Sequence, residues 1–207
     1  MPSLFAPVPF PADDPHAIVS RYPFALLVTN SAEGVHATSL PLVYETDDSR
    51  DVLVGHLARR NAHSAALQGD MYALAVFSGP NAYVSSRWYV DMPQVPTWNY
   101  VAAQVRGKLT PIDDLEDNRR VLARTIAVME RINESPWTLQ DAPEGRVATL
   151  LPMIRSFSFR IDRIEGVTRL SQKHGAADRE RVAGHLAAQD DGDANEIARM
   201  MAALRLS

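Results

Sequence analysis

Short apolar runs separated by polar turns fill the first half of the chain. The runs at 24–30, 35–45, 52–58 and 71–80 have the length and composition of β-strands. The first three are joined by the brief polar segments SAEG and TDDSRD, so we expect them to form an antiparallel meander. The sequence also predicts a short strand at NAYVSS and a long strand at TWNYVAAQVRGKLTPI. Pro41 lacks a backbone donor, which predicts that its strand is bulged or at an edge.

A helical period begins after residue 112. Between residues 115 and 132, the apolar residues fall on one face of an amphipathic helix, and a second, shorter helix is expected in APEGRVATLLPM. The segment 154–167 alternates Phe157, Phe159 and Ile161 with polar residues, which predicts a strand with one buried face. The last segment predicts two helices separated at DDGD.

This order of elements favours one fold class. Many short strands in antiparallel order, combined with separate helices, predict an α+β fold built on a small closed barrel. We expect a single domain over residues 1–207, with a helical insertion at about 112–152 and C-terminal helices at about 175–205.

Composition excludes several function classes. The net charge of −4 and the pI near 5.8 argue against a general nucleic-acid binder. The chain has no Cys, which rules out thiolate catalysis and Cys-ligated metal sites. Neither HExxH nor GxSxG occurs, and the six His form no recognisable zinc triad. The first residues have no signal-peptide pattern, and no apolar run has the length of a membrane span, so we expect a cytoplasmic protein.

Cationic and polar residues gather in GHLARRNAH, at the end of the predicted strand 52–58. Arg59 carries a planar fork that suits a phosphate or carboxylate, and His56 carries an imidazole that can hydrogen-bond or ligate a metal. A ligand site at a barrel mouth is one interpretation of this segment. The other is that Arg60 and His63 are solvated loop residues and that His56 is a half-buried strand residue.

Three further segments carry candidate site residues. In VHATSLPLVY, Thr38 and Ser39 point to opposite faces of a strand; a bulge there could offer backbone groups to a flat ring, or the strand is a plain edge. In VPTWNY, Trp98 and Tyr100 lie on one face and Thr97 and Asn99 on the other; the pattern leaves open which pair faces a ligand. The segment RLSQKH reads by itself as a polar loop.

Taken together, GHLARRN, GPNAYVSSRWY, VPTWNY and RLSQ resemble, in order and approximate spacing, the PaiB-like family of FMN-binding negative transcriptional regulators. The resemblance runs from about residue 4 to residue 187. It implies a split β-barrel of the flavin-reductase and pyridoxamine-oxidase-like kind, working as a homodimer with FMN in a groove between subunits. The cofactor-binding residues expected on this basis are Thr38, Ser39, His56, Arg59, Asn61, Thr97, Trp98, Asn99, Gln104, Arg106, Ser171 and Gln172.

The sequence departs from the family pattern at several positions. Ser39 stands where the family has the His of THLP, Ser86 where it has the Pro of SPxW, and Gln104 where it often has His. Arg169 and Lys173 replace the first and last residues of K-x-SQN.

A second resemblance implies haem as the cofactor. The short linker VDMPQV, with GPNAYVS and QVRG, looks like the piperazate synthases, a haem-dependent offshoot that closes N-hydroxyornithine by forming an N–N bond. In that case haem b would be the cofactor and His56 its axial ligand. The expected functions are therefore an FMN-binding transcriptional regulator or flavin-dependent reductase, a haem enzyme, or a cofactor-free regulatory dimer. The sequence names no catalytic residue, and whether DNA is bound stays open.

Overall fold

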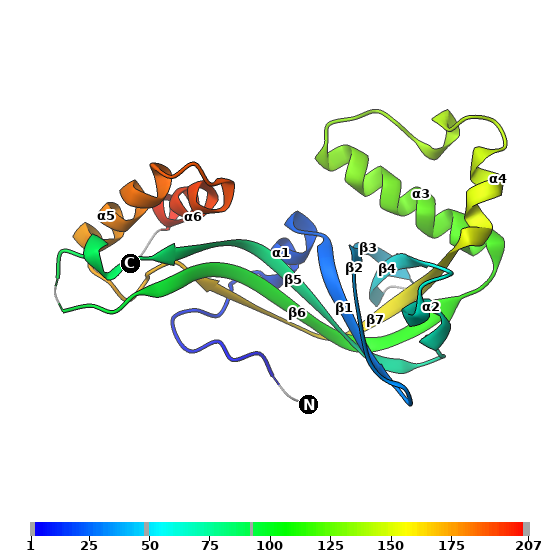
Figure 1. The fold of residues 1–207 in the computed structure, drawn as a ribbon, viewed down its shortest axis with the longest axis horizontal. Helices are drawn as coiled ribbons and strands as arrows, with labels where there is room; N and C mark the ends of the chain where they lie inside the picture. Colours follow the sequence, from blue (N-terminus) through cyan, green and yellow to red (C-terminus); the bar gives the residue numbers. More distant parts are fainter. Residues whose placement is uncertain (1–2, 48–49, 92, 205–207) are drawn as a thin grey trace. The chain divides into compact units, whose positions relative to one another are not determined.

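The computed structural model describes residues 3–47, 50–91 and 93–204 (Figure 1). The strands are β1 (Phe24–Ser31), β2 (Gly34–Pro41), β3 (Val43–Asp47), β4 (Arg50–Ala58), β5 (Met71–Val84), β6 (Thr97–Ile112) and β7 (Ile154–Arg169). The α-helices are α1 (Pro15–Arg21), α2 (Ala62–Ala66), α3 (Leu115–Ile132), α4 (Arg146–Leu150), α5 (Ala176–Ala187) and α6 (Gly192–Ala203). Short 3-10 helices are η1 (Ser86–Trp88), η2 (Leu139–Asp141) and η3 (Leu151–Met153).

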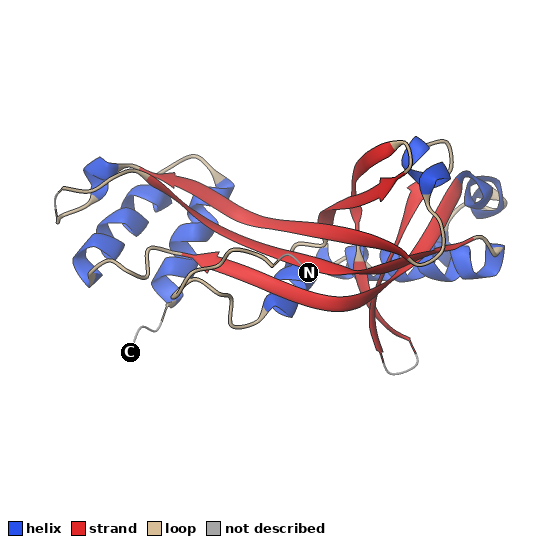
Figure 2. Cartoon of the chain, turned by 90° about the horizontal axis from the view of Figure 1, so that it is seen from below, coloured by secondary structure: helices blue, strands red, loops and turns tan. Residues whose placement is uncertain are grey.

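The strands form one sheet in the order β2-β1-β5-β6-β7-β4-β3. The pairs β1–β2, β1–β5, β3–β4 and β4–β7 are antiparallel, and β2 also contacts β4. The long strands β5, β6 and β7 are neighbours, and Figure 2 draws them as long red arrows that run side by side. The α+β class expected from the sequence is therefore observed.

The predicted meander is wrong at its second strand. The run 35–45 is two strands, β2 and β3, which lie at opposite edges of the sheet. Pro41 has no N–H to continue a ladder, and the next amide, that of fully buried Leu42, donates to the carbonyl of Pro23 at 2.8 Å. The prediction that Pro41 belongs to an edge strand is confirmed. The separate short strand predicted at NAYVSS is also wrong, since β5 continues to Val84.

The chain divides into two compact units. The first contains residues 3–19, 78–91, 93–103 and 165–204 of the described chain, and the second contains 20–47, 50–77 and 104–164. Each unit includes a part of β5, of β6 and of β7. The single domain expected from the sequence stays a prediction.

In the second unit, large apolar side chains fill the inner face of the sheet. Phe77, Phe157 and Phe159 are fully buried there, together with Leu27, Leu53 and Leu109. Helix α3 covers part of the other face, where Val121 and Val128 pack with Val43, Val52 and Val54 (Figure 1). The predicted helical insertion thus contributes its own apolar layer beside β3 and β4.

Asn118 anchors α3 to β7. This fully buried side chain donates to the carbonyls of Ile112 and Asp114 at 3.2 and 2.6 Å, and its oxygen accepts the amide of Ser156 at 2.7 Å. Asp114 caps the helix by accepting the amides of Glu116 and Asp117. Every polar group of Asn118 is therefore satisfied by backbone, which is what its burial requires.

In the first unit, α5 and α6 pack against each other (Figure 1), and the two helices bury Val182, Leu186, Ile197 and Met201. The buried carboxylate of Asp178, in the first turn of α5, accepts the amides of Val90 and Asp91 at 2.5 and 3.3 Å. In the described part of the chain, no helix is both long enough and apolar enough to cross a membrane.

Candidate functional site

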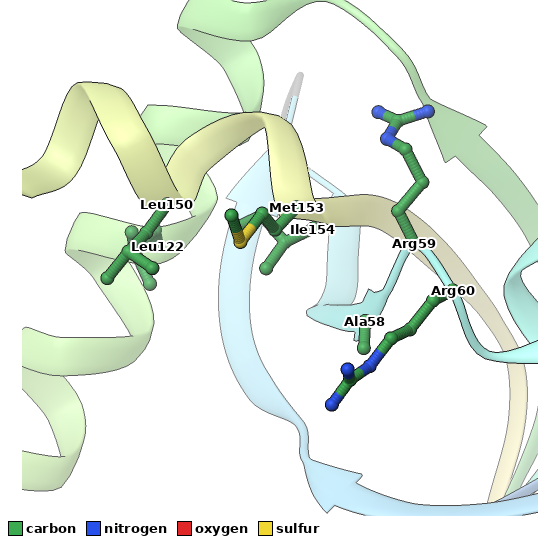
Figure 3. A pocket seen from close by; sticks show the side chains of 7 residues that line it. All are labelled: Ala58, Arg59, Arg60, Leu122, Leu150, Met153 and Ile154. Atoms are coloured by element: carbon green, nitrogen blue, oxygen red, sulfur yellow. The ribbon is translucent and has the colours of Figure 1, made fainter.

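A pocket of about 880 Å³ lies in the second unit, at the end of β4 (Figure 3). One side is formed by Ala58, Arg59 and Arg60, and the other by apolar residues of α3, α4, η3 and β7. These are Leu122, Leu150, Met153 and Ile154. Leu150 is 38% exposed and Met153 58% exposed, and both line the same pocket. The pocket therefore offers an uncovered apolar wall beside two guanidinium groups.

The two arginines differ in what they already bind. Arg59 donates from Nε to the carbonyl of Pro152 at 3.1 Å, and its Nη1 lies 3.7 Å from the carboxylate of Asp113. Arg60 makes no hydrogen bond or ion pair with any residue that the structure describes. Figure 3 shows the two side chains leaving β4 in different directions. Of the two arginines that line the pocket, the predicted Arg59 is already engaged, and Arg60 has no partner among the described residues.

A network of hydrogen bonds holds the turn at Arg59 and Arg60, next to the pocket. The amide of Arg59 donates to the carbonyl of Met153 at 2.7 Å. Arg155, whose side chain is only 16% exposed, donates from Nη1 to the carbonyls of Ser64 and Leu67 at 2.8 and 3.2 Å. Its Nε and Nη2 form a fork on Asp113 at 2.7 and 2.8 Å. The fork is the main cause that lowers the pKa of the Asp113 carboxyl.

His56 lies on the same face of β4 as Ala58, because side chains two residues apart share a face. It is half-buried, its Nδ1 is buried without a hydrogen-bond partner, and burial lowers its pKa so that the imidazole stays neutral. Its cross-strand neighbour Ser156 is fully buried, and its Oγ also lacks a partner within the described structure. Two such polar atoms on facing residues are rare and need an explanation.

Thr38 and Asn61 meet at His63. The Thr38 hydroxyl lies 2.9 Å from His63 Nδ1, and the Asn61 amide donates to the same hydroxyl at 3.4 Å. Asn61 also caps α2 by accepting the amide of His63 at 3.0 Å. His63 is buried, so the interpretation of His63 as a solvated loop residue is wrong.

The remaining predicted residues of the second unit lie on β2 and β6. Ser39 is exposed on the opposite face of β2 from Thr38. Arg106 donates to the Gln104 side chain at 2.6 Å, and both lie half-buried on β6.

The other predicted residues belong to the first unit. Asn99 is fully buried and exchanges hydrogen bonds with Ser171 at 3.0 and 3.2 Å. Trp98 is 51% exposed and meets Tyr83 edge to face. Thr97 accepts a hydrogen bond from Arg169, and Gln172 closes its own turn by bonding the backbone of Thr168 and Leu170. Of the two faces of VPTWNY, the face that carries Thr97 and Asn99 is therefore more buried than the face that carries Trp98 and Tyr100.

Sequence reasoning did not select Arg60, His63 or Ser156. The sequence does not distinguish Arg60 from Arg59, because the two differ only in their contacts in the folded chain, where Arg59 binds Pro152 and Asp113. His63 could have been found from its position two residues after the N-cap Asn61, which places it in the first turn of α2. Nothing in the sequence marks Ser156 among the alternating polar residues of β7.

Residues 4–163 match the model of a protein family described as "Putative FMN-binding domain". The "Protease synthase and sporulation protein PAI 2" of Bacillus subtilis is 28% identical over 187 residues, which are 88% of this chain and 87% of that protein. The uncharacterized protein AN0679 of Emericella nidulans is 30% identical over 184 residues, 72% of this chain and 73% of its own.

Solved structures show the same fold at low identity. The flavocytochrome Anf3 from Azotobacter vinelandii aligns with a TM-score of 0.55 and 15% identity, over 75% of this chain and 65% of that one. The FAD and haem binding protein from Mycobacterium smegmatis aligns with a TM-score of 0.54 and 15% identity, over 73% and 68%. The split-barrel fold expected from the sequence is confirmed.

Proposed function

Because this chain belongs to the FMN-binding domain family that its residues 4–163 match, we propose that it binds FMN in the pocket at the end of β4 and acts as a homodimeric flavin-dependent oxidoreductase. The predicted PaiB-like resemblance is confirmed by the family match and by the Bacillus subtilis relative. FMN, the cofactor expected from the sequence, agrees with that family.

The residues present fit FMN. A flavin has a planar, largely apolar ring and a phosphate dianion, and sites for such molecules combine apolar walls with a few convergent polar groups. Leu122, Leu150 and Met153 would contact the ring, and Arg60 would hold the phosphate by its planar fork. The unengaged guanidinium of Arg60 beside an uncovered apolar wall is the observation that carries this proposal. Bound FMN would supply electron and hydride transfer, while the protein supplies binding and orientation.

An apolar sheet face supports the homodimer. In the second unit, Leu26 pairs with Val76 and Val28 with Leu74, on the face of β1 and β5 opposite to the core. Leu26 is 40% exposed, and Phe24 on the same face is 65% exposed. Contiguous exposed apolar residues of this kind mark protein interaction sites.

The experiment is a titration that separates ring from phosphate. FMN and riboflavin differ only in the phosphate, so affinities for both are measured by flavin fluorescence with the wild-type protein, Arg60→Gln and a matched control, Arg119→Gln. Arg119 is an exposed arginine of α3 that, among the described residues, forms an ion pair only with Glu116, one turn away. Losing one charge-assisted contact should weaken FMN binding by about 10- to 100-fold in Arg60→Gln. Riboflavin affinity should stay the same in all three proteins. Equal FMN affinity in the wild type and Arg60→Gln would refute the phosphate site.

Haem is a second candidate, favoured by His56. A neutral, half-buried imidazole is the kind of side chain that ligates a haem iron, and the ligating atom would be Nε2, because Nδ1 is buried. In this case hemin would give a Soret band that His56→Gln removes, and a band unaffected by the substitution would exclude His56 as the ligand. A regulatory role on DNA is the alternative if neither cofactor stays bound. A gel-shift measurement with the protein's own promoter region would test it.

A further inference from the structure

His63 joins α2 to the β1–β2 hairpin through both of its ring nitrogens. The side chain is 2% exposed. Its Nε2 lies 2.9 Å from the hydroxyl of Thr29 on β1, and its Nδ1 lies 2.9 Å from the hydroxyl of Thr38 on β2. A neutral imidazole has one N–H donor and one acceptor, and a hydroxyl can play either part. The two threonines therefore satisfy the neutral ring completely.

The same cluster fixes the turn that carries Arg60. The amide of Asn61 donates to the carbonyl of Ala58 at 2.9 Å, which closes the turn around Arg59 and Arg60. The Asn61 side chain then ties that turn to His63 and to Thr38. Arg60 is thus held between the end of β4 and a buried histidine three residues further along.

The surroundings of His63 disfavour a positive charge. From β2, His36 stacks on it with ring centroids 5.3 Å apart and an interplanar angle of 22°. Two further cations lie on neighbouring segments: Arg60 precedes His63 by three residues, and the Arg155 guanidinium binds the carbonyls of Ser64 and Leu67. Asp113, the carboxylate that binds Arg155, is engaged by that guanidinium. Thr29, Thr38 and Asn61 are uncharged.

We propose that His63 is a positioning residue for the anion-binding turn at Arg60, and that it holds this turn only as a neutral imidazole, so that acid releases the turn. The part that concerns ligand affinity rests on the proposed FMN site. The part that concerns the turn itself does not.

Protonation would require both nitrogens to donate, so both threonine hydroxyls would have to accept, in a buried place beside a stacked histidine. Burial first, and the charge of His36 second, lower the pKa of His63 below its ordinary 6.5. For a group whose folded pKa is lowered, the unfolded chain binds the proton more tightly. Its contribution to stability is therefore full above about pH 6.5 and is lost as the pH falls toward the folded pKa.

The first test uses the protein without any ligand. Nitrogen-15 NMR of the imidazole rings, recorded between pH 4 and 8, should show His63 as a neutral tautomer at pH values where exposed histidines are already charged. Amide hydrogen exchange at Asn61 and Ser64 should accelerate when His63 finally titrates, and not before. A His63 that titrates at or above 6.5, or exchange that does not follow its titration, would overturn the proposal.

The second test compares affinities across pH. The phosphate of FMN itself titrates near pH 6, so the wild type alone does not decide the matter. His63→Gln keeps an amide that can bond both threonines and removes the titration, and His185→Gln, on α5 of the first unit, serves as control. FMN affinity should fall more steeply from pH 7.5 to 5.5 in the wild type than in His63→Gln. Identical pH profiles would overturn the role of His63. If FMN fails to bind the wild type even at pH 7.5, the proposed function fails, and the ligand-free test still decides the turn.

Discussion

The guanidinium of Arg155 donates two hydrogen bonds to the carboxylate of Asp113, at 2.7 and 2.8 Å, although the two residues are 42 positions apart in the sequence. The same guanidinium reaches the carbonyls at the end of α2. One side chain of β7 thus joins the entrance to α3, the helix α2 and the turn that shapes the pocket.

Replacing Arg155 by Gln should destabilise the protein. The fork on Asp113 is lost, and two backbone carbonyls lose a charged donor. We expect the free energy of unfolding to fall by about 2–3 kcal/mol, measured by urea denaturation. Arg160→Gln is the matched control, because Arg160 is on the same strand but its side chain is 44% exposed and, in the part of the chain that the structure describes, pairs only with Asp162. It should cost less than about 0.5 kcal/mol. Equal losses in the two variants would show that the network does not stabilise the fold.

Acid should weaken the same pair. Hydrogen bonds from Arg155, and then the charges of Arg155 and Arg59, lower the pKa of Asp113. A carboxyl with a lowered folded pKa contributes stability above its unfolded pKa, near 3.8, and that contribution disappears as the pH falls through the folded value. The difference in urea midpoint between wild type and Asp113→Asn should be constant from pH 7 to 5 and shrink below about pH 4. A difference that persists unchanged to pH 2 would contradict the assignment.

The sequence predicted most elements because their patterns are local. The amphipathic period of α3 and the alternation around Phe157 and Phe159 each depend on neighbours along the chain. The division of the run 35–45 into β2 and β3 was missed because these strands pair with different partners, β1 and β4, which no local pattern records. The site was only partly predictable for the same reason. Arg59 and Arg60 differ through contacts with Pro152 and Asp113, which no local pattern records.

Gly107 should not accept a side chain. A Cβ at this position would overlap the carbonyl oxygen of Arg160 and lie 2.9 Å from the ring of Phe159. The carbonyl belongs to the neighbouring strand of the sheet and cannot move without opening the pairing of β6 and β7. Gly107→Ala should therefore lower the free energy of unfolding by about 3 kcal/mol or more, seen by thermal and urea denaturation. Gly69→Ala is the control, since nothing lies within 4 Å of its added Cβ. A stable Gly107→Ala protein would show that β6 and β7 do not approach as described.

Asn99 should matter more for stability than its neighbour Trp98. Its amide is fully buried and exchanges two hydrogen bonds with Ser171, which holds a left-handed backbone angle of 62°. Removing it leaves the Ser171 hydroxyl without these partners in a buried place, so Asn99→Ala should cost about 2–3 kcal/mol in urea denaturation. Trp98→Ala removes a half-exposed ring and should cost about 1 kcal/mol or less. FMN affinities of both variants are measured in parallel at 10 °C, where each remains folded. A loss of FMN affinity in Asn99→Ala without a loss of stability would instead place Asn99 in the cofactor site, where the family resemblance expected it.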